Sequence, residues 1–545
     1  MRIIFLFLLA ALAAAPAAGD TARGRVFEDL NGDGFYDDGE PGVPDVRVSN
    51  GLGIIATDSN GEYRIDVGDE AIVFIVKPKG FLTPVNELQI PQFYYIHQPA
   101  GSPPSLRYPG VAPTGSLPDH INFPLVRHRE PTRFKAILFA DPQPQSGAEI
   151  DYIRDDVLAE LVGTDAKFGM TVGDIMFDDL SLFPRSNALI AQLGIPWYNV
   201  PGNHDLNFAA SDDRYSLETF KRYFGPPYYS FEYGEALFVV LDNIEYRGAG
   251  LSKPGNVRNN GGHVSKFGRR QLSWLEAELA RVPRDHLIVL AMHAPLETYV
   301  APGAAVVDRA KLLDIVSGRP NLYAIAGHTH TTEHHYFAKE DGFRGPGTFH
   351  QHVLSTVSGA WWSGPFDSRG IPTTDQRDGT PNGYHILTVD GERVQARYKA
   401  AGFPADYQMR ILFDVAHHGT GARGRRDYRT GELFDGRFPS SHLSAAQILV
   451  NFFDGGPRSK VGFRIDDGQY RPMTRVRRTD PYMLESSTRD NGGRKTWTRA
   501  APSSHLYTAR LPNELQPGTY RVSVEAIDEF GNSHHGHTLL ELTGP

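Results

Sequence analysis

Two short stretches organise this chain, Ala291-Met-His-Ala-Pro295 and Gly327-His-Thr-His330. Each lies where an apolar run of strand-like length ends, at 287–292 and at 322–326. Polar side chains at the ends of neighbouring strands are brought together at one edge of a sheet. The two stretches therefore predict a cluster of imidazoles at a sheet edge.

Three stretches upstream have the same form. Ala140-Asp-Pro-Gln143, Gly173-Asp174 and Gly202-Asn-His-Asp205 each follow a strand-like run. A single Asp or His in such a place usually has a structural role, as a buried and hydrogen-bonded group. All five stretches together combine carboxylates, carboxamides and imidazoles, which is a donor set for divalent metal ions. A glycine or proline beside each strand end permits a sharp turn and a close approach to an ion. The pattern therefore favours a metal site.

The region that contains these stretches alternates strand and helix signals. Apolar residues recur at helical spacing in 149–161, 182–193 and 267–280, between the strand-like runs. This alternation predicts an α/β layer architecture for 128–401. At 545 residues, 40% of them hydrophobic and 22% charged, the chain is globular and too long for one core.

Both flanks of this region have short strand-like runs divided by polar turns. They predict an N-terminal β-sandwich at 20–127 and a C-terminal β-sandwich of immunoglobulin-like size, without helices, at 402–545. The expected fold is therefore an α/β sandwich between two all-β domains.

A calcium-loop pattern lies within the N-terminal domain, at 29–40. Oxygen donors stand at positions 1, 3, 5, 9 and 12 of this loop, with glycine at 6 and a backbone carbonyl at 7. The expected ligands are Asp29, Asn31, Asp33, the Phe35 carbonyl, Asp37 and Glu40. The stretch 29–50 resembles repeat modules of bacterial surface adhesins, which carry such a loop. One structural calcium ion is expected, and an acidic turn without an ion is the alternative.

The amino terminus has the features of an export signal. Arg2 precedes an unbroken apolar run at 3–14, and the small residues at 15–19 suit signal-peptidase cleavage. No other stretch approaches the ~20 consecutive apolar residues of a membrane span. We therefore expect 1–19 to be a signal peptide and the chain to be periplasmic, secreted or part of the cell envelope, with a retained N-terminal anchor as the alternative.

Composition excludes other kinds of site and partner. The chain has no cysteine, so it has neither disulfides nor thiolate metal ligands. Its formal net charge is -9, and no block of Lys and Arg is dense enough for a nucleic-acid-binding surface. Nucleic acid is therefore not an expected partner.

The order of the five stretches resembles that of the calcineurin-like metallophosphoesterases, over the whole central region. The flanking domains resemble those of one exported bacterial subgroup. The resemblance implies an αββα sandwich with two divalent metal ions bridged by Asp174. It also implies the remaining ligands: Asp141, Gln143 and His330 for the first ion, and Asn203, His293 and His328 for the second.

The same resemblance implies the chemistry. A hydroxide that bridges the two ions would attack phosphorus in line. His204 would stabilise the developing charge or protonate the leaving oxygen. Asp205 or Asp178 would orient the His204 imidazole.

Two positions depart from the family pattern. Gln143 stands where the family usually has histidine, and a carboxamide oxygen is a weaker and harder donor. The first ion is therefore expected to bind loosely and to favour manganese, unless Gln143 lies outside the ligand set. Phe177 stands where an aspartate is usual, with Asp178 after it, and the tyrosine of purple acid phosphatases is absent. The mixed ligands favour manganese, iron or zinc, without iron–phenolate chemistry.

Loops after the last ligand contain candidates for binding the substrate. They are Trp361, Trp362, Asn382 and Tyr384. An exposed tryptophan can stack on a base, a sugar or an aromatic leaving group, and core packing is the alternative. His334, His335, His350 and His352 are candidates for the mouth of the site, again with a structural role as the alternative.

We therefore expect an exported phosphoesterase with two metal ions that acts on a small phosphate mono- or diester. The alternative is a catalytically silent envelope or adhesion protein on a phosphoesterase scaffold. The flanking β-domains motivate that alternative, and the nearly complete ligand set opposes it.

Overall fold

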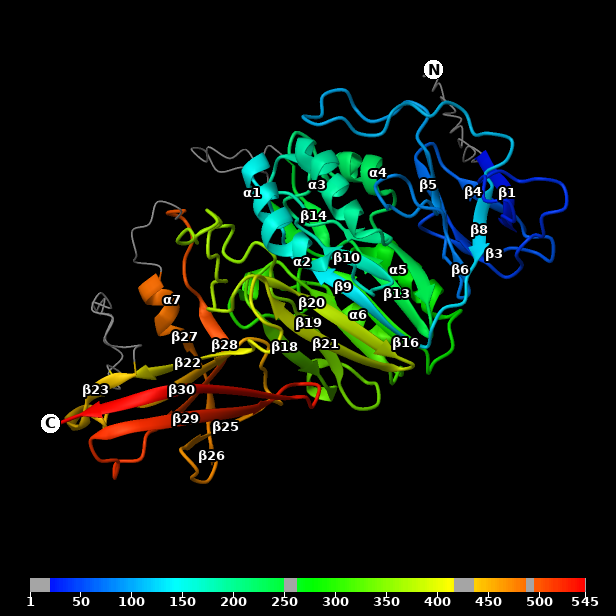
Figure 1. Cartoon of the computed structure of the whole chain (residues 1–545). Helices are drawn as coiled ribbons and strands as arrows, with labels where there is room; N and C mark the ends of the chain where they lie inside the picture. Colours follow the sequence, from blue (N-terminus) through cyan, green and yellow to red (C-terminus); the bar gives the residue numbers. More distant parts are fainter. Residues whose placement is uncertain (1–19, 249–261, 416–435, 487–494, 545) are drawn as a thin grey trace, which may run out of the picture.

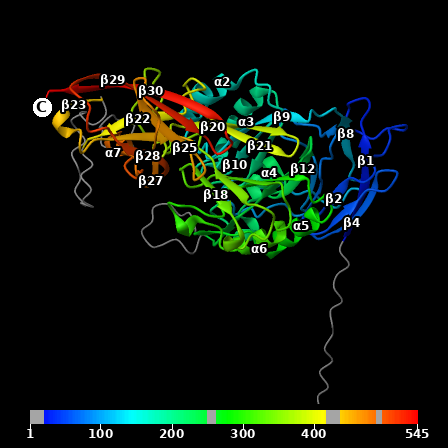
Figure 2. The ribbon, with the colours of Figure 1, turned by 90° about the horizontal axis from the view of Figure 1, so that it is seen from below.

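The computed structural model describes residues 20–248, 262–415, 436–486 and 495–544. The predicted signal peptide at 1–19 lies outside these residues. Three β-rich regions follow one another along the chain, and the first and last lie on opposite sides of the central one (Figures 1 and 2). In the part of the chain described, no helix is long and apolar enough to cross a membrane.

The N-terminal module, β1 to β8, is a pair of four-stranded sheets. In spatial order the first is β4 (Glu62–Val67), β1 (Asp20–Glu28), β8 (Phe123–Arg127) and β6 (Phe81–Leu82), and the second is β3 (Ile54–Ala56), β2 (Arg47–Ser49), β5 (Ala71–Ile75) and β7 (Tyr94–His97). Strand β4 shows why the sequence pairs this way: Tyr63, Ile65 and Val67 are buried and the residues between them are exposed.

The central sandwich, β9 to β21, consists of two larger sheets. In spatial order they are β11 (Trp197–Val200), β10 (Phe168–Val172), β9 (Arg133–Phe139), β20 (Gly383–Asp390) and β21 (Arg393–Ala400), and β12 (Tyr229–Tyr233), β13 (Ala236–Leu241), β16 (Leu287–Met292), β17 (Leu322–Ala326), β19 (Phe349–Val353) and β18 (Glu333–Phe337). β9 to β11 are parallel, as are β13, β16, β17 and β19. A small pair, β14 (Ile244–Tyr246) and β15 (His263–Ser265), lies apart.

Helices cover the outer face of each central sheet. On β9, Ile137 and Phe139 pack with apolar residues of α1 (Gly147–Tyr152), η1 (Ile153–Leu158), α2 (Ala159–Leu161), α3 (Phe183–Ile190) and η3 (Ala191–Leu193), while Ala136 and Leu138 join the main core. β13 and β16 are buried throughout, and they share that core with α4 (Glu218–Phe224), α5 (Arg269–Leu279) and α6 (Arg309–Val316). The layers are therefore helix, sheet, sheet, helix, which confirms the predicted αββα sandwich.

Short 3₁₀ turns complete these regions. They are η2 (Leu180–Leu182), η4 (Asp213–Tyr215), η6 (Pro302–Ala304), η7 (Lys339–Asp341) and η9 (Ser440–His442). The long segment between β7 and β8 packs on the central sandwich, because the Tyr108 carbonyl accepts from Asn207 Nδ2 at 2.8 Å and the Tyr108 hydroxyl donates to the Asp178 carbonyl at 3.1 Å. It therefore supports the loop that follows β10.

The C-terminal module, β22 to β30, has two sheets and its own apolar core. The sheets are β22 (Met409–Asp414), β24 (Gln447–Phe452), β28 (Pro502–Arg510) and β27 (Thr474–Thr479), and β23 (Arg437–Pro439), β30 (Ser533–Thr543), β29 (Gly518–Ile527), β25 (Lys460–Ile465) and β26 (Arg471–Pro472). The prediction that this region has no helix is wrong, because α7 (Pro481–Ser486) follows β27. Asp480 accepts from the Tyr482 amide at 2.9 Å and Pro481 begins the helix, which is a helix-start signal that the sequence contains.

Candidate metal centre

All seven predicted ligands lie at one edge of the central sandwich, on loops that leave the carboxyl ends of its parallel strands. Asp141, Asp174 and Asn203 follow β9, β10 and β11, whereas His293 and His328 follow β16 and β17. Both sheets therefore contribute ligands to a single site, as expected for strand ends in an α/β fold.

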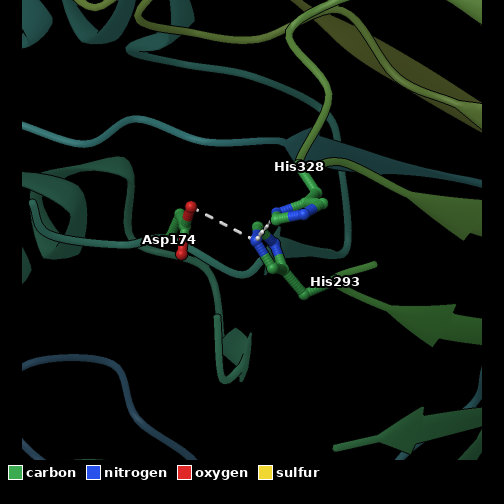
Figure 3. Close-up of side chains that lie close together, drawn as sticks. All are labelled: Asp174, His293 and His328. Atoms are coloured by element: carbon green, nitrogen blue, oxygen red, sulfur yellow. Dashed lines mark hydrogen bonds and ion pairs between the residues drawn. The ribbon is translucent and has the colours of Figure 1, made fainter. Parts of the chain in front are cut away.

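The set predicted for the second ion converges closely. The His293 Nε2 atom lies 3.2 Å from Asp174 Oδ2, 3.1 Å from Asn203 Oδ1 and 3.1 Å from His328 Nδ1. Figure 3 shows Asp174, His293 and His328 pointing toward one another from three separate loops. His293 Nδ1 donates to the Val172 carbonyl at 3.0 Å, so Nε2 is the nitrogen that faces the other donors. Two carboxyl or carboxamide oxygens and two imidazole nitrogens are thus within reach of one ion.

The set predicted for the first ion contains two buried acceptors without a partner. His330 Nδ1 donates to the Gly359 carbonyl at 2.6 Å, and within the described residues its buried Nε2 has no hydrogen-bond partner. The Oε1 atom of Gln143 is likewise buried and unpartnered, while its amide nitrogen donates to Asp174. Asp141 completes the set, with Oδ1 3.6 Å from His330 Nε2. Since buried polar atoms are normally paired, these two acceptors fit a bound cation.

Backbone strain is concentrated in these loops. Eleven non-glycine residues of the described chain have positive φ, and all but Asp45, Gln89 and Asp466 lie at or beside the site. The site members are Asp141, Gln143, Asp174, Asp178, His328, His330, Trp361 and Trp362. Such conformations cost about 1–2 kcal/mol per residue and persist where the surrounding structure enforces them, typically at functional sites.

Glycines make room for the ligands. A Cβ atom on Gly173 would collide with the His293 ring, one on Gly202 with the Asp174 carboxylate, and one on Gly327 with Asp141 Oδ2. These three glycines therefore let the site loops pack directly against the candidate ligands.

In the site, burial and neighbouring charges shift the pKa values of several groups in opposite directions. Burial raises the pKa of Asp141 to about 7 and lowers the pKa of His330 to about 3. Burial also disfavours the charge of Asp174, but the nearby imidazoles of His293 and His204 hold the pKa of this carboxyl below its ordinary value. Against burial, Asp174 raises the pKa of His293 to about 9. The Asp174 carboxylate thus favours a positive charge close by, which a divalent cation would supply.

His204 is held beside this cluster by three contacts. Its amide donates to Asp174 Oδ1 at 2.8 Å, its Nδ1 lies 2.6 Å from Asp178 Oδ1, and its ring stacks on Phe177 with centroids 4.3 Å apart. Although burial favours the neutral ring, the carboxylates of Asp174 and Asp178 raise the pKa of His204. The imidazole is therefore fixed in direction and able to carry a proton.

The role predicted for Asp205 is not the one it has. Its carboxylate accepts from the amides of Ile175, Met176 and Gly202 at 3.1, 3.0 and 2.9 Å, so it holds two site loops together. Of the two aspartates considered, only Asp178 contacts the His204 ring in the described structure.

Three of the four predicted substrate-binding residues are part of the core. Trp362 is buried and donates from Nε1 to the Pro142 carbonyl at 3.0 Å, Tyr384 packs on Phe139, and Asn382 donates to Asp156 Oδ2 at 2.9 Å. They support the site loops and do not face a substrate. The alternative of core packing is therefore the correct one for these residues.

Trp361 does lie at the site, and it is joined by residues that the sequence did not single out. Its ring stacks on His330 at 3.9 Å, and Trp497 of the C-terminal module lies 4.9 Å from Trp361 and 5.9 Å from Phe177. His263, on β15, has its ring 5.9 Å from that of His328. The metal cluster is thus bordered by an aromatic wall to which the C-terminal module contributes.

The histidines predicted for the mouth lie elsewhere. His334, His335 and His352 are buried within strands β18 and β19, and His350 is partly buried. His335 Nε2 pairs with Glu333 at 2.8 Å, away from the metal cluster's ligands. A structural position, the alternative considered, is therefore correct for this group.

The predicted calcium loop has its side chains turned inward. Asn31 Nδ2 donates to Asp33 at 3.1 Å and to Asp37 at 3.0 Å, while Asp29 and Glu40 accept from loop amides. The Phe35 side chain is 75% exposed, and the Phe35 amide donates to Asp33 Oδ1 at 2.8 Å. The carboxylates of Asp29, Asp33, Asp37 and Glu40 are thus gathered within one loop.

Comparison with known proteins identifies the family. Residues 30–108 match a model described as the N terminal of calcineurin-like phosphoesterase, 136–332 match calcineurin-like phosphoesterase itself, and 351–534 match the C terminal of calcineurin-like phosphoesterase. A probable glycerophosphodiester phosphodiesterase GpdQ of Arcobacter nitrofigilis is 27% identical over 142 residues, which are 25% of this chain and 46% of that protein. The chain thus spans about half the length of this relative.

Solved structures give more distant similarities. Purple acid phosphatase PPD1 of yellow lupin seeds aligns over 66% of this chain and 67% of its own, with 13% identity and a TM-score of 0.36. PhoD aligns over 71% of this chain and 86% of its own, with 11% identity and a TM-score of 0.37. From the three family matches, which cover the metal loops and both flanking modules, it follows that this chain belongs to the calcineurin-like phosphoesterases.

Proposed function

We propose that this protein is a phosphoesterase that works with two divalent metal ions, manganese, iron or zinc. The observation that carries the proposal is the convergence of Asp174, Asn203, His293 and His328, next to the unpartnered acceptors of Gln143 and His330. Two bound ions would supply an activated water nucleophile and would neutralise charge on the phosphoryl oxygens. The mixed oxygen and nitrogen donors favour these metals over magnesium.

The remaining catalytic roles fall to Asp178 and His204. The Asp178 carboxylate orients His204 through Nδ1, so Nε2 is directed away from Asp178 and is available to a substrate. Because the nearby carboxylates raise its pKa, His204 is suited to donate a proton to the departing oxygen. Phe177 stacks on the ring and Trp497 packs beside Phe177, so one face of the imidazole is covered.

The experiment that tests this proposal is hydrolysis of a matched pair of aryl esters. Purified protein loaded with manganese, zinc or iron is given an aryl phosphate monoester and a bis-aryl phosphate diester, and kcat/KM is measured for each. The name of the GpdQ relative makes the diester the first to test. Turnover of either ester supports the proposal, whereas a metal-loaded protein that hydrolyses neither favours the catalytically silent alternative.

Changing Gln143 to histidine is expected to tighten the first metal site. Imidazole is the stronger donor for manganese, zinc or iron, so Gln143→His should raise the affinity for the weaker ion by about tenfold or more. Metal titration followed by calorimetry or by manganese EPR measures the change. Gln145→His, which adds an imidazole two residues away, is the matched control. Equal affinities in both variants and the wild type would place Gln143 outside the ligand set.

Removing Trp497 is expected to weaken binding of aromatic esters. A stacked aromatic contact contributes about 0.5–1.5 kcal/mol, so Trp497→Ala should raise KM for the aryl diester by about three- to tenfold. The kcat value should change little, since Trp497 borders the site and is not among its proposed ligands. Tyr470→Ala, which removes an aromatic side chain 42% exposed on the same module, is the control. An unchanged KM in Trp497→Ala would exclude a role in binding.

The loop at 29–40 is proposed to hold a structural calcium ion. Calcium that binds only the folded state at 100 times its Kd raises the free energy of unfolding by about 2.7 kcal/mol. Thermal unfolding with calcium and with a chelator should show this increase in the wild type. Asp33→Asn with Glu40→Gln should abolish it, and Asp45→Asn, outside the loop, should not. Equal stability of the wild type with and without calcium would leave the loop an acidic turn.

Export remains a proposal from the sequence of 1–19. Expression of the full chain in a Gram-negative host, followed by cell fractionation and N-terminal sequencing, tests it. A protein in the periplasm or medium that begins near residue 20 supports a cleaved signal peptide. Full-length protein that stays with the membrane favours the retained anchor, and full-length protein in the cytoplasm contradicts export.

A further inference from the structure

A second cluster of histidines lies inside the molecule, apart from the proposed ligands of the catalytic ions. The Nε2 atoms of His352, His334 and His385 lie 2.8, 3.3 and 3.5 Å from one oxygen, Oδ1 of Asp454. The three histidines have no exposed surface, and Asp454 is 6% exposed. Three imidazole nitrogens thus approach one buried carboxylate oxygen, and the ligand atoms of His334, His352 and Asp454 lie close enough together to hold one ion.

The four residues come from three separate sheets. His334 on β18 and His352 on β19 are direct cross-strand partners, with rings 4.1 Å apart, and His385 is on β20 of the other central sheet. Asp454 follows β24 of the C-terminal module. The cluster therefore lies where both sheets of the central sandwich meet the C-terminal module.

Hydrogen bonds alone account poorly for this arrangement. A carboxylate oxygen has about two lone pairs to offer, and here three imidazole nitrogens approach the same one. Among the described residues, every ion-pair partner of Asp454 is a histidine, so a buried carboxylate relies on imidazoles for its countercharge. Within the same part of the chain, the Nδ1 atom of His385 has no hydrogen-bond partner. A divalent cation at the centre would balance the carboxylate and let all three rings be neutral.

The distances from Asp454 to the three imidazole nitrogens are close to the ligand separations of a tetrahedral zinc site. Ligands that each lie about 2.0–2.1 Å from zinc stand about 3.3 Å from one another. The separations of 2.8, 3.3 and 3.5 Å between the nitrogens and Asp454 Oδ1 bracket this value. The ligand atoms of His334, His352 and Asp454 all lie within 4.8 Å of one another, and His385 Nε2, 3.5 Å from Asp454 Oδ1, would complete a four-ligand set for zinc once drawn toward the ion.

Neighbouring groups fix which nitrogen faces the centre. The Tyr323 hydroxyl lies 2.8 Å from His352 Nδ1, and His350 Nε2 lies 2.9 Å from His334 Nδ1. Outer partners of this kind hold metal-binding imidazoles in one tautomer and orientation. They leave Nε2 of both rings directed at Asp454.

The C-terminal module closes over the cluster. A Cβ atom on Gly456 would come within 2.9 Å of the His334 Cβ, so a residue without a side chain is needed for the loop after β24 to lie on β18. Phe530, in the turn between β29 and β30, has its ring 5.7 Å from that of His350 and 6.3 Å from that of His334. This turn, dark red in Figure 1, reaches the central sandwich. The site is accordingly sealed from solvent by apolar and backbone contacts.

We propose that His334, His352, His385 and Asp454 bind a structural zinc ion that fastens the C-terminal module to the central sandwich. The ion has no catalytic part, because its ligands are buried and His385 would close the fourth position. Since Trp497 belongs to the fastened module, zinc here also helps to keep the aromatic wall in place. The inference uses none of the residues proposed for catalysis and does not depend on the proposed function.

Metal analysis of chelator-treated protein tests the inference. Protein made in zinc-supplemented medium and dialysed against EDTA should keep about one zinc ion per chain, because a sealed site exchanges slowly. The double variant Asp174→Asn/His293→Asn, which damages the catalytic cluster, should keep it too. Folded wild-type protein that retains only substoichiometric zinc after this treatment would overturn the proposal.

Variants of the cluster identify the ligands. Asp454→Asn and His352→Gln should lose the resistant zinc and unfold at lower temperature. His505→Gln is the matched control: it removes a buried histidine paired with Asp378 at 3.0 Å in the same interface, and it should keep the zinc.

X-ray absorption at the zinc edge of the dialysed wild type supports the assignment without relying on variants that fold. About four nitrogen or oxygen ligands, with about three imidazoles, are expected. Resistant zinc that survives in His352→Gln/Asp454→Asn, or that shows fewer imidazoles, would contradict it.

Discussion

Replacing Asp174 with asparagine is expected to lower kcat/KM for aryl phosphate esters by about a thousandfold or more. Bound metal ions supply several kcal/mol of transition-state stabilisation, and each 1.36 kcal/mol is tenfold in rate. The Asp174 carboxylate is the proposed bridge between both ion sites, and its Oδ1 also accepts from the His204 amide at 2.8 Å. An asparagine keeps the shape but removes the charge and directs an amide toward His293 or Gln143. The assay is steady-state hydrolysis together with metal content per chain.

The control for this variant is Asp165→Asn, which neutralises a carboxylate that is 73% exposed and pairs with Lys135 near the start of β9. It should retain wild-type activity and metal content. If Asp174→Asn kept both its metal ions and its activity, Asp174 would not be the bridge, and the two ligand sets would have to be reassigned.

Removing the His204 imidazole is expected to have the next largest effect, a loss of about 10²–10⁴ in kcat with a smaller change in KM. His204 is oriented by Asp178 at 2.6 Å and supported by Phe177, and it is not among the proposed ligands. His204→Ala should therefore keep its metal ions while it loses rate. Asp178→Asn, which leaves the ring but loosens its orientation, should show a milder loss in the same parameter.

The two roles considered for His204 can be told apart by comparing esters with different leaving groups. If it donates a proton to the departing oxygen, His204→Ala should slow an alkyl ester more than a nitrophenyl ester, because nitrophenolate leaves without a proton. A loss of equal size on both esters would indicate that His204 stabilises charge on the phosphoryl group instead. His120→Ala, an exposed histidine of the N-terminal module, is the control and should leave both rates unchanged. Unchanged rates in His204→Ala would exclude either role.

The sequence predicted correctly that the seven candidate ligands meet at one edge of the sandwich, because each follows a strand and the strand ends meet there. The pattern required only local information: an apolar run, a glycine or proline, and a polar donor. The structure adds what local information does not contain, such as the close contact of Gly202 with Asp174 and the orientation of His204 by Asp178 and not by Asp205.

The residues that the sequence did not identify, or for which it indicated the wrong role, are positioned by tertiary packing. Trp362 and Tyr384 follow the last ligand in sequence, but their rings pack beneath α1 and β9, which no local signal indicates. Trp497 reaches the site from the C-terminal module, and nothing in its own segment points there. β18 has the sequence Glu-His-His-Tyr-Phe with four of its five residues buried, so hydrophobic periodicity does not predict it.

Because β18 is a buried strand with polar residues, its sequence alone does not indicate a second histidine cluster. Histidines near a metal motif are naturally assigned to its mouth, whereas His334 and His352 face away into a separate cluster with Asp454. Only the pairing of β18 with β19, together with the position of the C-terminal module, brings these residues to one point.

The most direct test of the central claim is a metal titration of the dialysed protein against its own activity. Protein freed of exchangeable ions is mixed with increasing manganese, and diester hydrolysis and bound metal are measured on the same samples. Activity should be absent at the start and should level off at about two added ions per chain, with the second ion bound more weakly through Gln143. Hydrolysis that needs no added metal and survives in Asp174→Asn, or no hydrolysis of any mono- or diester with both ions bound, would contradict the account.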